Sequence, residues 1–209
     1  MRILLVILSL MVSSFAGFAQ FGLDGIEKKE IVEAGDIIYL KSTLPFTIDY
    51  SNQANKWIDA TYLQFKDGTP LDEYDYDSYE LSANQASYDR AIRSTFTKKE
   101  FDALAKNPPA QMTIYYVVSP GGETLEVAFI IPKESKILID LPPEKFALLE
   151  KNLKKNLKWT VNDFGKQMLF LHAWEFTDFP TMKIQYPLFP SAGGTVGSQP
   201  VNGGTHKLP

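Results

Sequence analysis

The stretch that decides the fold is MTIYYVV-SPGGE-TLEVAFII, residues 112 to 131. Two runs of apolar and β-branched residues, 112–118 and 124–131, stand on either side of the pair Gly121-Gly122. Such runs favour extended strands, and glycine accepts the backbone angles that a tight turn requires. The sequence therefore predicts a β-hairpin at this point.

The chain that follows the hairpin predicts a helix packed on a sheet. Pro142 and Pro143 suit the first turn of a helix, where a backbone donor is not needed. Apolar residues then recur at helical spacing and give one apolar stripe: Phe146, Leu149, Leu153 and Leu157. Further short strands are expected at 137–141, 159–161, 167–176 and 182–188.

The chain before the hairpin is also rich in β-branched and aromatic residues. Strands are predicted at 37–40, 46–48 and 57–65, because these residue types favour extended backbone. Asp67-Gly68 then marks a turn, since both residues accept the backbone angles of one.

Two helix starts are indicated between these strands and the hairpin. Ser82 is followed by Gln85, and Thr97 by Glu100, at the three-residue spacing of a capping box. In such a box each side chain accepts a hydrogen bond from a backbone N–H group that would otherwise lack a partner. We therefore expect one helix to follow each box.

These elements together predict an α+β fold, with a mixed or antiparallel sheet and two to three helices packed on one face. Residues 20–186 are expected to form a single domain, with 31–95 and 96–186 as possible halves. A chain of this length can bury a core without disulfides, and it contains no cysteine. Glycine and proline dominate 187–209, which predicts a disordered tail.

Residues 1–19 have the layout of a cleavable signal peptide. Arg2 precedes an apolar run at 3–12, and small residues lead to Ala19. The sequence thus predicts export, with cleavage before Gln20, and an uncleaved N-terminal anchor is the alternative. No later segment is apolar over the roughly 20 residues that span a bilayer. The mature protein is expected in the periplasm or outside the cell, and the missing cysteines favour a bacterial envelope.

An acidic, tyrosine-rich segment at 71–80 contains five acids and no base. Asp72, Asp75 and Asp77 are candidate oxygen ligands for calcium. The loop glycine and the spacing of an EF-hand are missing, however, so a solvated acidic segment is the favoured interpretation.

Four lysines fall in the last part of the helix predicted after Pro143, namely Lys151, Lys154, Lys155 and Lys158. They are candidates for binding an acidic protein surface or anionic lipid. Lysines at a helix C-terminus also stabilise the helix dipole, which explains them without any partner.

Signatures of catalysis and of cofactor binding are absent from the sequence. There is no G-x-S-x-G elbow, phosphate loop or dinucleotide fingerprint, and His172 is the only histidine in the predicted domain. No cofactor is therefore expected, and a net charge of −4 does not predict a nucleic-acid partner. Acids near tryptophans keep a carbohydrate-active protein open as an alternative: Asp59 near Trp57, and Glu175 or Asp178 near Trp174.

The order of elements from Thr113 to Phe176 resembles the C-terminal domain of TonB-type energy-coupling proteins. The resemblance rests on the hairpin YYVVSPGG at 115–122, the helix, the sequence Leu157-Lys158-Trp159 and the strand that ends at Phe176. It implies a periplasmic module whose exposed strand pairs with a partner protein.

The sequence as a whole favours an exported, non-catalytic protein-binding module of the cell envelope, whose partner is another envelope protein. The alternative is a carbohydrate-active or calcium-binding secreted domain.

Overall fold

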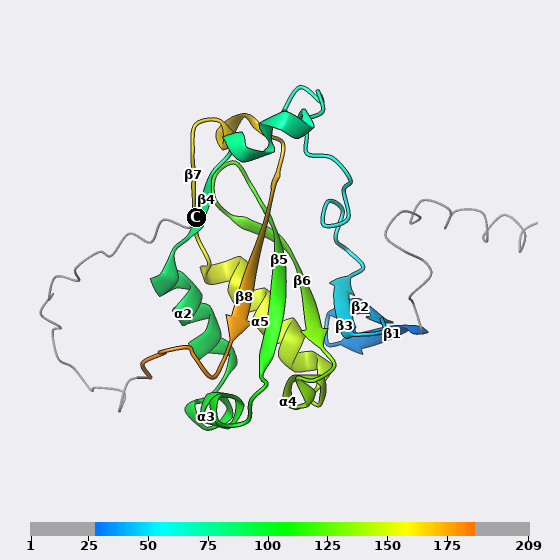
Figure 1. Cartoon of the computed structure of the whole chain (residues 1–209), viewed down its shortest axis with the longest axis vertical. Helices are drawn as coiled ribbons and strands as arrows, with labels where there is room; N and C mark the ends of the chain where they lie inside the picture. Colours follow the sequence, from blue (N-terminus) through cyan, green and yellow to red (C-terminus); the bar gives the residue numbers. More distant parts are fainter. Residues whose placement is uncertain (1–27, 187–209) are drawn as a thin grey trace, which may run out of the picture.

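The computed structural model describes residues 28–186 of the chain. Its main feature is a six-stranded sheet in the order β1-β2-β3-β6-β5-β8, in which all neighbouring strands run antiparallel (Figure 1). The strands are β1 (Lys28–Ala34), β2 (Ile37–Thr43), β3 (Thr47–Asn52), β5 (Gln111–Val118), β6 (Thr124–Pro132) and β8 (Leu171–Asp178). A second, two-stranded sheet joins β4 (Leu81–Ala83) to β7 (Trp159–Val161).

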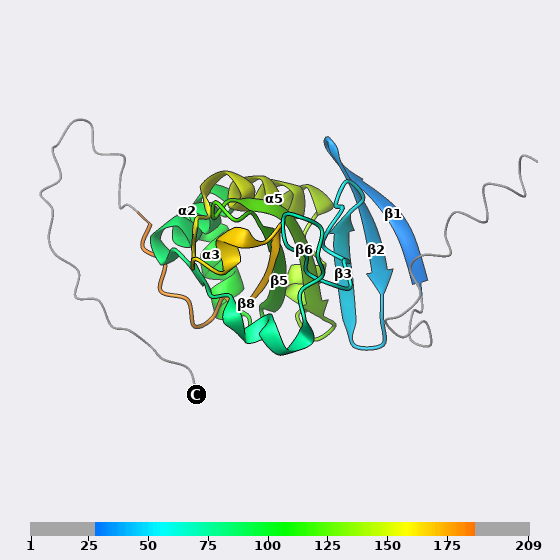
Figure 2. The ribbon, with the colours of Figure 1, turned by 90° about the horizontal axis from the view of Figure 1, so that it is seen from above.

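The longer helices lie together on one side of the six-stranded sheet. Figure 2 shows α2 and α5 on this side and the short helix η3 on the other. The helices are η3 (Glu73–Ser78), α2 (Gln85–Thr95), α3 (Lys98–Lys106), α4 (Lys136–Ile139), α5 (Pro143–Asn156) and η4 (Gly165–Gln167). The predicted α+β fold is thus confirmed, and the sheet is the antiparallel version of the two that were expected.

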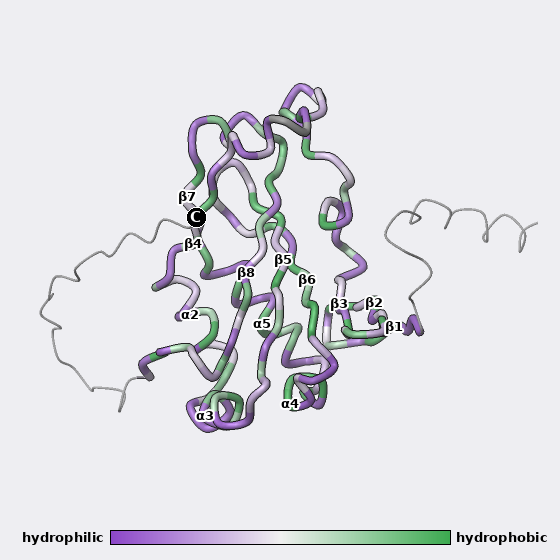
Figure 3. Tube along the Cα trace, in the orientation of Figure 1, coloured by the Kyte–Doolittle hydropathy of each residue, from purple (hydrophilic) through white to green (hydrophobic). Residues whose placement is uncertain are grey.

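The core lies between the sheet and α5. The hydrophobic residues of β6 run through the middle of the molecule (Figure 3), and Phe129 and Ile131 on this strand are fully buried. The ring of Phe146 on α5 stacks on Tyr50 at 4.8 Å and contacts Phe129 at 5.5 Å between ring centroids. Aromatic pairs of this kind stabilise a core beyond their buried area.

The hairpin predicted from residues 112–131 is confirmed as β5 and β6. The N–H of Ser119 donates to the carbonyl oxygen of Glu123 at 2.8 Å and closes the turn. Gly122 has a φ of +82°, and a Cβ at this position would lie 2.2 Å from the carbonyl oxygen of Trp159. Only glycine fits a backbone that is both left-handed and this close to another chain segment.

One of the two predicted capping boxes is confirmed and the other is wrong. Thr97 caps α3 in a complete box with Glu100, as expected. α2, however, is capped by Asn84, whose side chain accepts from the N–H of Ser87. Ser82 lies instead in β4, because its backbone pairs with β7. The apolar stripe of α5 and the strand at 159–161 are confirmed, and this strand belongs to the small sheet.

Three predicted strands are wrong. The stretch 57–65 is a loop in which only Gln64 and Phe65, at its end, form isolated β-bridges. The stretch 137–141 contains α4, and 182–186 forms no strand. β1 and the residues 49–52 of β3 were missed by the prediction. These errors concern short apolar runs, for which composition does not separate strand, helix and packed loop.

The sheet takes strands from both of the possible halves, because β3 pairs with β6 across residues 47–51. The predicted signal peptide at 1–19 and the predicted tail at 187–209 lie outside the described residues. Within 28–186, no helix has the length and apolar character needed to cross a bilayer.

Candidate binding surface

The two faces of the large sheet differ in what covers them. Tyr50 and Phe129 point to α5, and Thr177 points to α2, where its hydroxyl lies 2.6 Å from that of Tyr88. Because side chains alternate along a strand, the neighbours of these residues point the other way. The face that α2 and α5 do not cover is called the open face below (Figure 2).

Three large aromatic side chains lie on the open face, on β5 and β8. Tyr115 pairs with Trp174 directly across the two strands, and Phe176 lies two residues further along β8. Trp174 is 67% exposed, Phe176 53% and Tyr115 40%. Neighbouring exposed aromatic groups are a common feature of protein interfaces. We call these three residues the aromatic surface.

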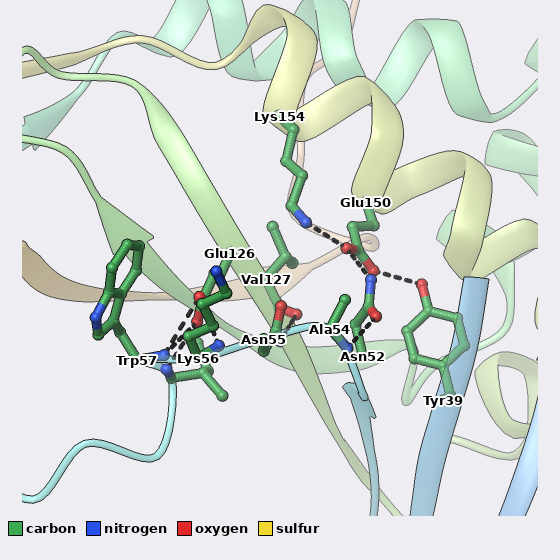
Figure 4. A network of polar contacts seen from close by, with 11 residues as sticks. Tyr39, Asn52, Ala54, Asn55, Lys56, Trp57, Glu126, Val127, Glu150 and Lys154 are labelled. Atoms are coloured by element: carbon green, nitrogen blue, oxygen red, sulfur yellow. Dashed lines mark hydrogen bonds and ion pairs between the residues drawn. The ribbon is translucent and has the colours of Figure 1, made fainter. Parts of the chain in front are cut away.

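A loop borders the aromatic surface, and the carboxylate of Glu126 holds it in place. This buried carboxylate accepts hydrogen bonds from the backbone N–H groups of Lys56, Trp57 and Ile58, at 2.7 to 3.2 Å (Figure 4). His172 adds a further contact, since its Nε2 donates to the carbonyl oxygen of Trp57 at 2.8 Å. The only histidine of the predicted domain therefore fixes a loop.

β8 is an edge strand, and part of its outer edge is free. In an antiparallel strand the N–H and C=O of one residue point to the same side. The hydroxyl of Tyr79 donates to the carbonyl oxygen of His172 at 3.4 Å, and the N–H of Thr181 donates to that of Asp178 at 3.1 Å. The backbone groups of His172 and Asp178 therefore point outward, away from β5. Because alternate residues of a strand point the same way, the backbone groups of residues 174 and 176 also point outward, and they have no hydrogen-bond partner within residues 28–186.

Glu175 and Asp178, the two acids near Trp174 in the sequence, lie on opposite faces of the sheet. Asp178 shares the open face with Trp174, and its Oδ1 atom is buried without a partner within residues 28–186. Glu175 points to the helix-covered face, whereas Trp174 next to it points to the open face. Burial and the carboxylate of Glu126 raise the pKa of Asp59. Glu126 cannot act as its catalytic partner, because the loop's backbone N–H groups already surround its oxygens.

Of the four predicted lysines, Lys154 belongs to an internal network. Its Nζ lies 2.6 Å from the carboxylate of Glu150, which is 1% exposed. The same carboxylate accepts from the hydroxyl of Tyr39 at 2.7 Å and from the side chain of Asn52 at 2.8 Å (Figure 4). This network joins α5 to β2 and β3, so the role of Lys154 is structural.

The other three lysines lie at the surface. Lys158 is 3.8 Å from the carboxylate of Glu123, and both groups are exposed. Lys151 and Lys155 are exposed and form no ion pair within the described residues. The structure therefore does not gather the four lysines into one patch of free charge.

The acidic segment predicted as a possible calcium site forms η3 and its flanks. Asp72, Asp75 and Asp77 are all exposed. In the part of the chain from 28 to 186, no group of three or more His, Asp or Glu side chains is arranged to hold a metal ion. The solvated acidic segment fits these observations better than a metal site.

The aromatic surface and the free edge of β8 are not evident from the residue pattern. The strand was expected within 167–176, and Trp174 and Phe176 alternate along it with Glu175 and Thr177. That alternation is the signal for two unlike faces, but it does not say which face a helix covers.

Comparison with known proteins identifies the fold alone. No family model and no curated protein matches this chain. The chain is similar to the crystal structure of a DUF5043 family protein from Bacteroides uniformis, with 18% sequence identity and a TM-score of 0.58. The match covers 79% of this chain and 94% of that one. The resemblance to the TonB C-terminal domain stays a prediction, because no match concerns it.

Proposed function

We propose that this protein is an exported, non-catalytic binding module of the cell envelope, and that its aromatic surface binds another protein. The observation that carries the proposal is the exposure of Trp174, Tyr115 and Phe176 next to one another on the open face. Tryptophan and tyrosine are enriched among the residues that dominate binding energy at protein interfaces.

The surroundings of these aromatic residues also suit an interface. Thr113 lies across from Phe176, and Ala128 lies across from Tyr115. Neither side chain is charged, and the centres of protein interfaces are depleted of charge. The free backbone groups of residues 174 and 176 add donors and acceptors for a partner strand, as in other complexes formed at a sheet edge.

Crosslinking in living cells tests this binding site. A photoreactive amino acid replaces Tyr115 in one variant and Leu148 in another, because Leu148 is similarly exposed but lies on α5. We expect the same envelope protein to be crosslinked from position 115 in repeated experiments, and not from 148. The band should disappear when Trp174→Ser is added to the first variant. Equal crosslinking from both positions, or no dependence on Trp174, would contradict the proposal.

A carbohydrate ligand is the second candidate, and the pairing of Trp174 with Tyr115 favours it. Two neighbouring aromatic rings on a sheet face resemble the platforms on which sugar rings stack. A glycan array probed with the folded protein distinguishes the candidates. Glycan binding that Trp174→Ser removes would support the sugar ligand, and an array without any binding would leave the protein partner.

The export part of the proposal rests on residues 1–19. Cells that express the full chain can be fractionated, and the purified protein can be sequenced from its N-terminus. We expect the protein in the envelope or the medium, with Gln20 as its first residue. A protein that keeps Met1 and stays in the cytoplasm would refute export.

A further inference from the structure

A group of polar side chains lies beneath α2, on the helix-covered side of β8. Tyr116 on β5 is completely buried, and its hydroxyl has no hydrogen-bond partner within residues 28–186. The Oε2 atom of Glu175 is also buried without a partner. The hydroxyls of Tyr88 and Thr177, which lie in the same place, bond to each other at 2.6 Å. Buried polar atoms in native proteins are normally hydrogen-bonded, and this group leaves two of its oxygen atoms unpaired within residues 28–186.

The group lacks a positive charge. Burial raises the pKa of Glu175 to about 7, and the carboxylate of Asp89 on α2 adds to the rise. The other groups that face Glu175 are Tyr88, Tyr116 and Thr177, which are all neutral. When Glu175 is ionised, it therefore has a second carboxylate nearby and no counter-ion from the described part of the chain.

Neither arginine of α2 acts on the pKa of Glu175. Arg90, the residue after Asp89, is exposed. Arg93, one turn along α2 from Asp89, donates from its guanidinium to the carbonyl oxygen of Gln185 at 3.2 Å. Asp89 itself accepts from the side chain of Gln85 at 2.8 Å, which holds its carboxylate without neutralising it. The negative charges of Glu175 and Asp89 are thus available to a partner.

The position of Glu175 connects this charge to the proposed partner. It lies between Trp174 and Phe176, whose backbone groups form the free edge of β8. A strand that paired with this edge would place alternate side chains on the two faces of the sheet. Side chains on one face would meet the aromatic surface. Those on the other face would meet Glu175 and Asp89 of α2, which interact with each other electrostatically.

We propose that Glu175 and Asp89 recognise a lysine or arginine side chain of a partner strand that pairs with the edge of β8. This inference rests on the proposed function and specifies its partner as an extended segment that alternates apolar and basic residues. The basic group would supply the counter-ion of Glu175, and buried carboxylates are otherwise rare without one.

The recognition should depend on pH. Glu175 must lose its proton to pair with a cation, and at about pH 6 most molecules carry that proton, whereas at about pH 8 few do. Binding that requires the ionised form should therefore be about tenfold tighter at pH 8 than at pH 6. Replacement of Glu175 by glutamine should abolish this dependence.

Short synthetic peptides that alternate valine with lysine, glutamine or glutamate are suitable probes. Their affinities for the folded protein can be measured by isothermal calorimetry at about pH 6 and pH 8. We expect the valine–lysine peptide to bind tightest, with the pH dependence described above. In Glu175→Gln the preference for lysine over glutamine should shrink by about tenfold, which corresponds to about 1.4 kcal/mol.

The matched control is Glu33→Gln, which removes an exposed acid from β1, the strand at the other edge of the sheet. This variant should bind all peptides like the parent protein. Equal loss of lysine preference in both variants would show general charge attraction and would overturn the inference. Equal binding of the three peptides, or binding of none at millimolar concentration, would overturn it as well.

The requirement for an edge strand can be tested separately with Phe176→Ala and Phe176→Pro. Both variants lose the ring, but proline also removes an outward N–H group that has no partner in the free protein, and edge strands accept such a proline. Weaker peptide binding to the proline variant than to the alanine variant is expected, and equal binding would refute strand pairing. If these tests fail while Trp174→Ser still removes crosslinking, the aromatic surface binds its partner through side chains alone, and the proposed function stands.

Discussion

Replacement of Glu126 by alanine removes the acceptor that three consecutive backbone N–H groups share. The carboxylate accepts from Lys56 at 2.7 Å, from Trp57 at 3.0 and 3.2 Å, and from Ile58 at 2.8 Å. A hydrogen bond to a charged group contributes about 1.5 to 3 kcal/mol to the free energy of unfolding. The loop can recover part of this by turning its N–H groups to water. We therefore expect Glu126→Ala to lower the free energy of unfolding by about 3 to 5 kcal/mol.

Urea denaturation measures this loss, and the control is Glu123→Ala on the same hairpin. Glu123 is 66% exposed and its ion pair with Lys158 is 3.8 Å long, so its replacement should cost less than about 0.5 kcal/mol. Hydrogen exchange adds a local measurement, because the amides of residues 56–58 should exchange faster in Glu126→Ala. A loss below about 1 kcal/mol, or unchanged exchange in this loop, would refute the view that Glu126 holds it.

Three further predictions concern the interior. Gly122→Ala should lower the free energy of unfolding by more than about 2 kcal/mol, because its Cβ would meet the carbonyl oxygen of Trp159 at a φ of +82°; a change under about 0.5 kcal/mol in urea denaturation would contradict the turn geometry. Glu150→Ala should cost about 3 to 5 kcal/mol and Tyr39→Phe only about 1, since the first leaves several buried groups unpaired; equal losses would argue against a shared network. Glu175 has a pKa raised from 4.5 to about 7, so the native state holds a proton that the unfolded state releases above about pH 4.5, and stability falls as the pH rises through about 7. Glu175→Gln should therefore be more stable than the parent protein at pH 8, by up to about 3 kcal/mol, and no more stable at pH 4; identical melting curves at pH 8 would refute the raised pKa.

The central hairpin could be predicted from the sequence because the residues that determine it are close together in the chain. Two apolar runs and the Gly121-Gly122 turn lie within one short stretch, and α5 has its own stripe of apolar residues. The stretch 57–65 misled the prediction for a physical reason. Leu63 is buried there and Trp57 packs on Phe170, so the stretch has the apolar content of a strand. Its backbone N–H groups, however, are satisfied in part by Glu126 from β6 instead of by a neighbouring strand.

The segment 137–141 illustrates a second limit of sequence patterns. It follows β6 and contains the buried Leu138, and a short apolar run of this kind suits a strand or a single helical turn equally well. Here the backbone N–H groups of Leu138 and Ile139 bond to the carbonyl oxygen of Ser135, which closes a helical turn. The residues of this segment do not indicate whether a strand or a helical turn forms.

The candidate site could not be predicted, because it depends on contacts between distant segments. The exposure of Trp174 and Phe176 results from the position of α2 and α5 on the other face of the sheet. The lack of a counter-ion at Glu175 depends on which residues of α2 face it. The lysines of α5 were the most visible charged group in the sequence, yet Lys154 is engaged with Glu150 inside the fold.

The most direct test of the aromatic surface as a binding site is the affinity of the purified crosslinked partner for two variants, Trp174→Ser and Leu148→Ser. Each variant removes one exposed apolar side chain, the first from the open face and the second from α5. The account predicts that Trp174→Ser weakens binding by at least about 30-fold, which corresponds to about 2 kcal/mol, and that Leu148→Ser leaves it unchanged. Equal affinity of the two variants for the partner would contradict it.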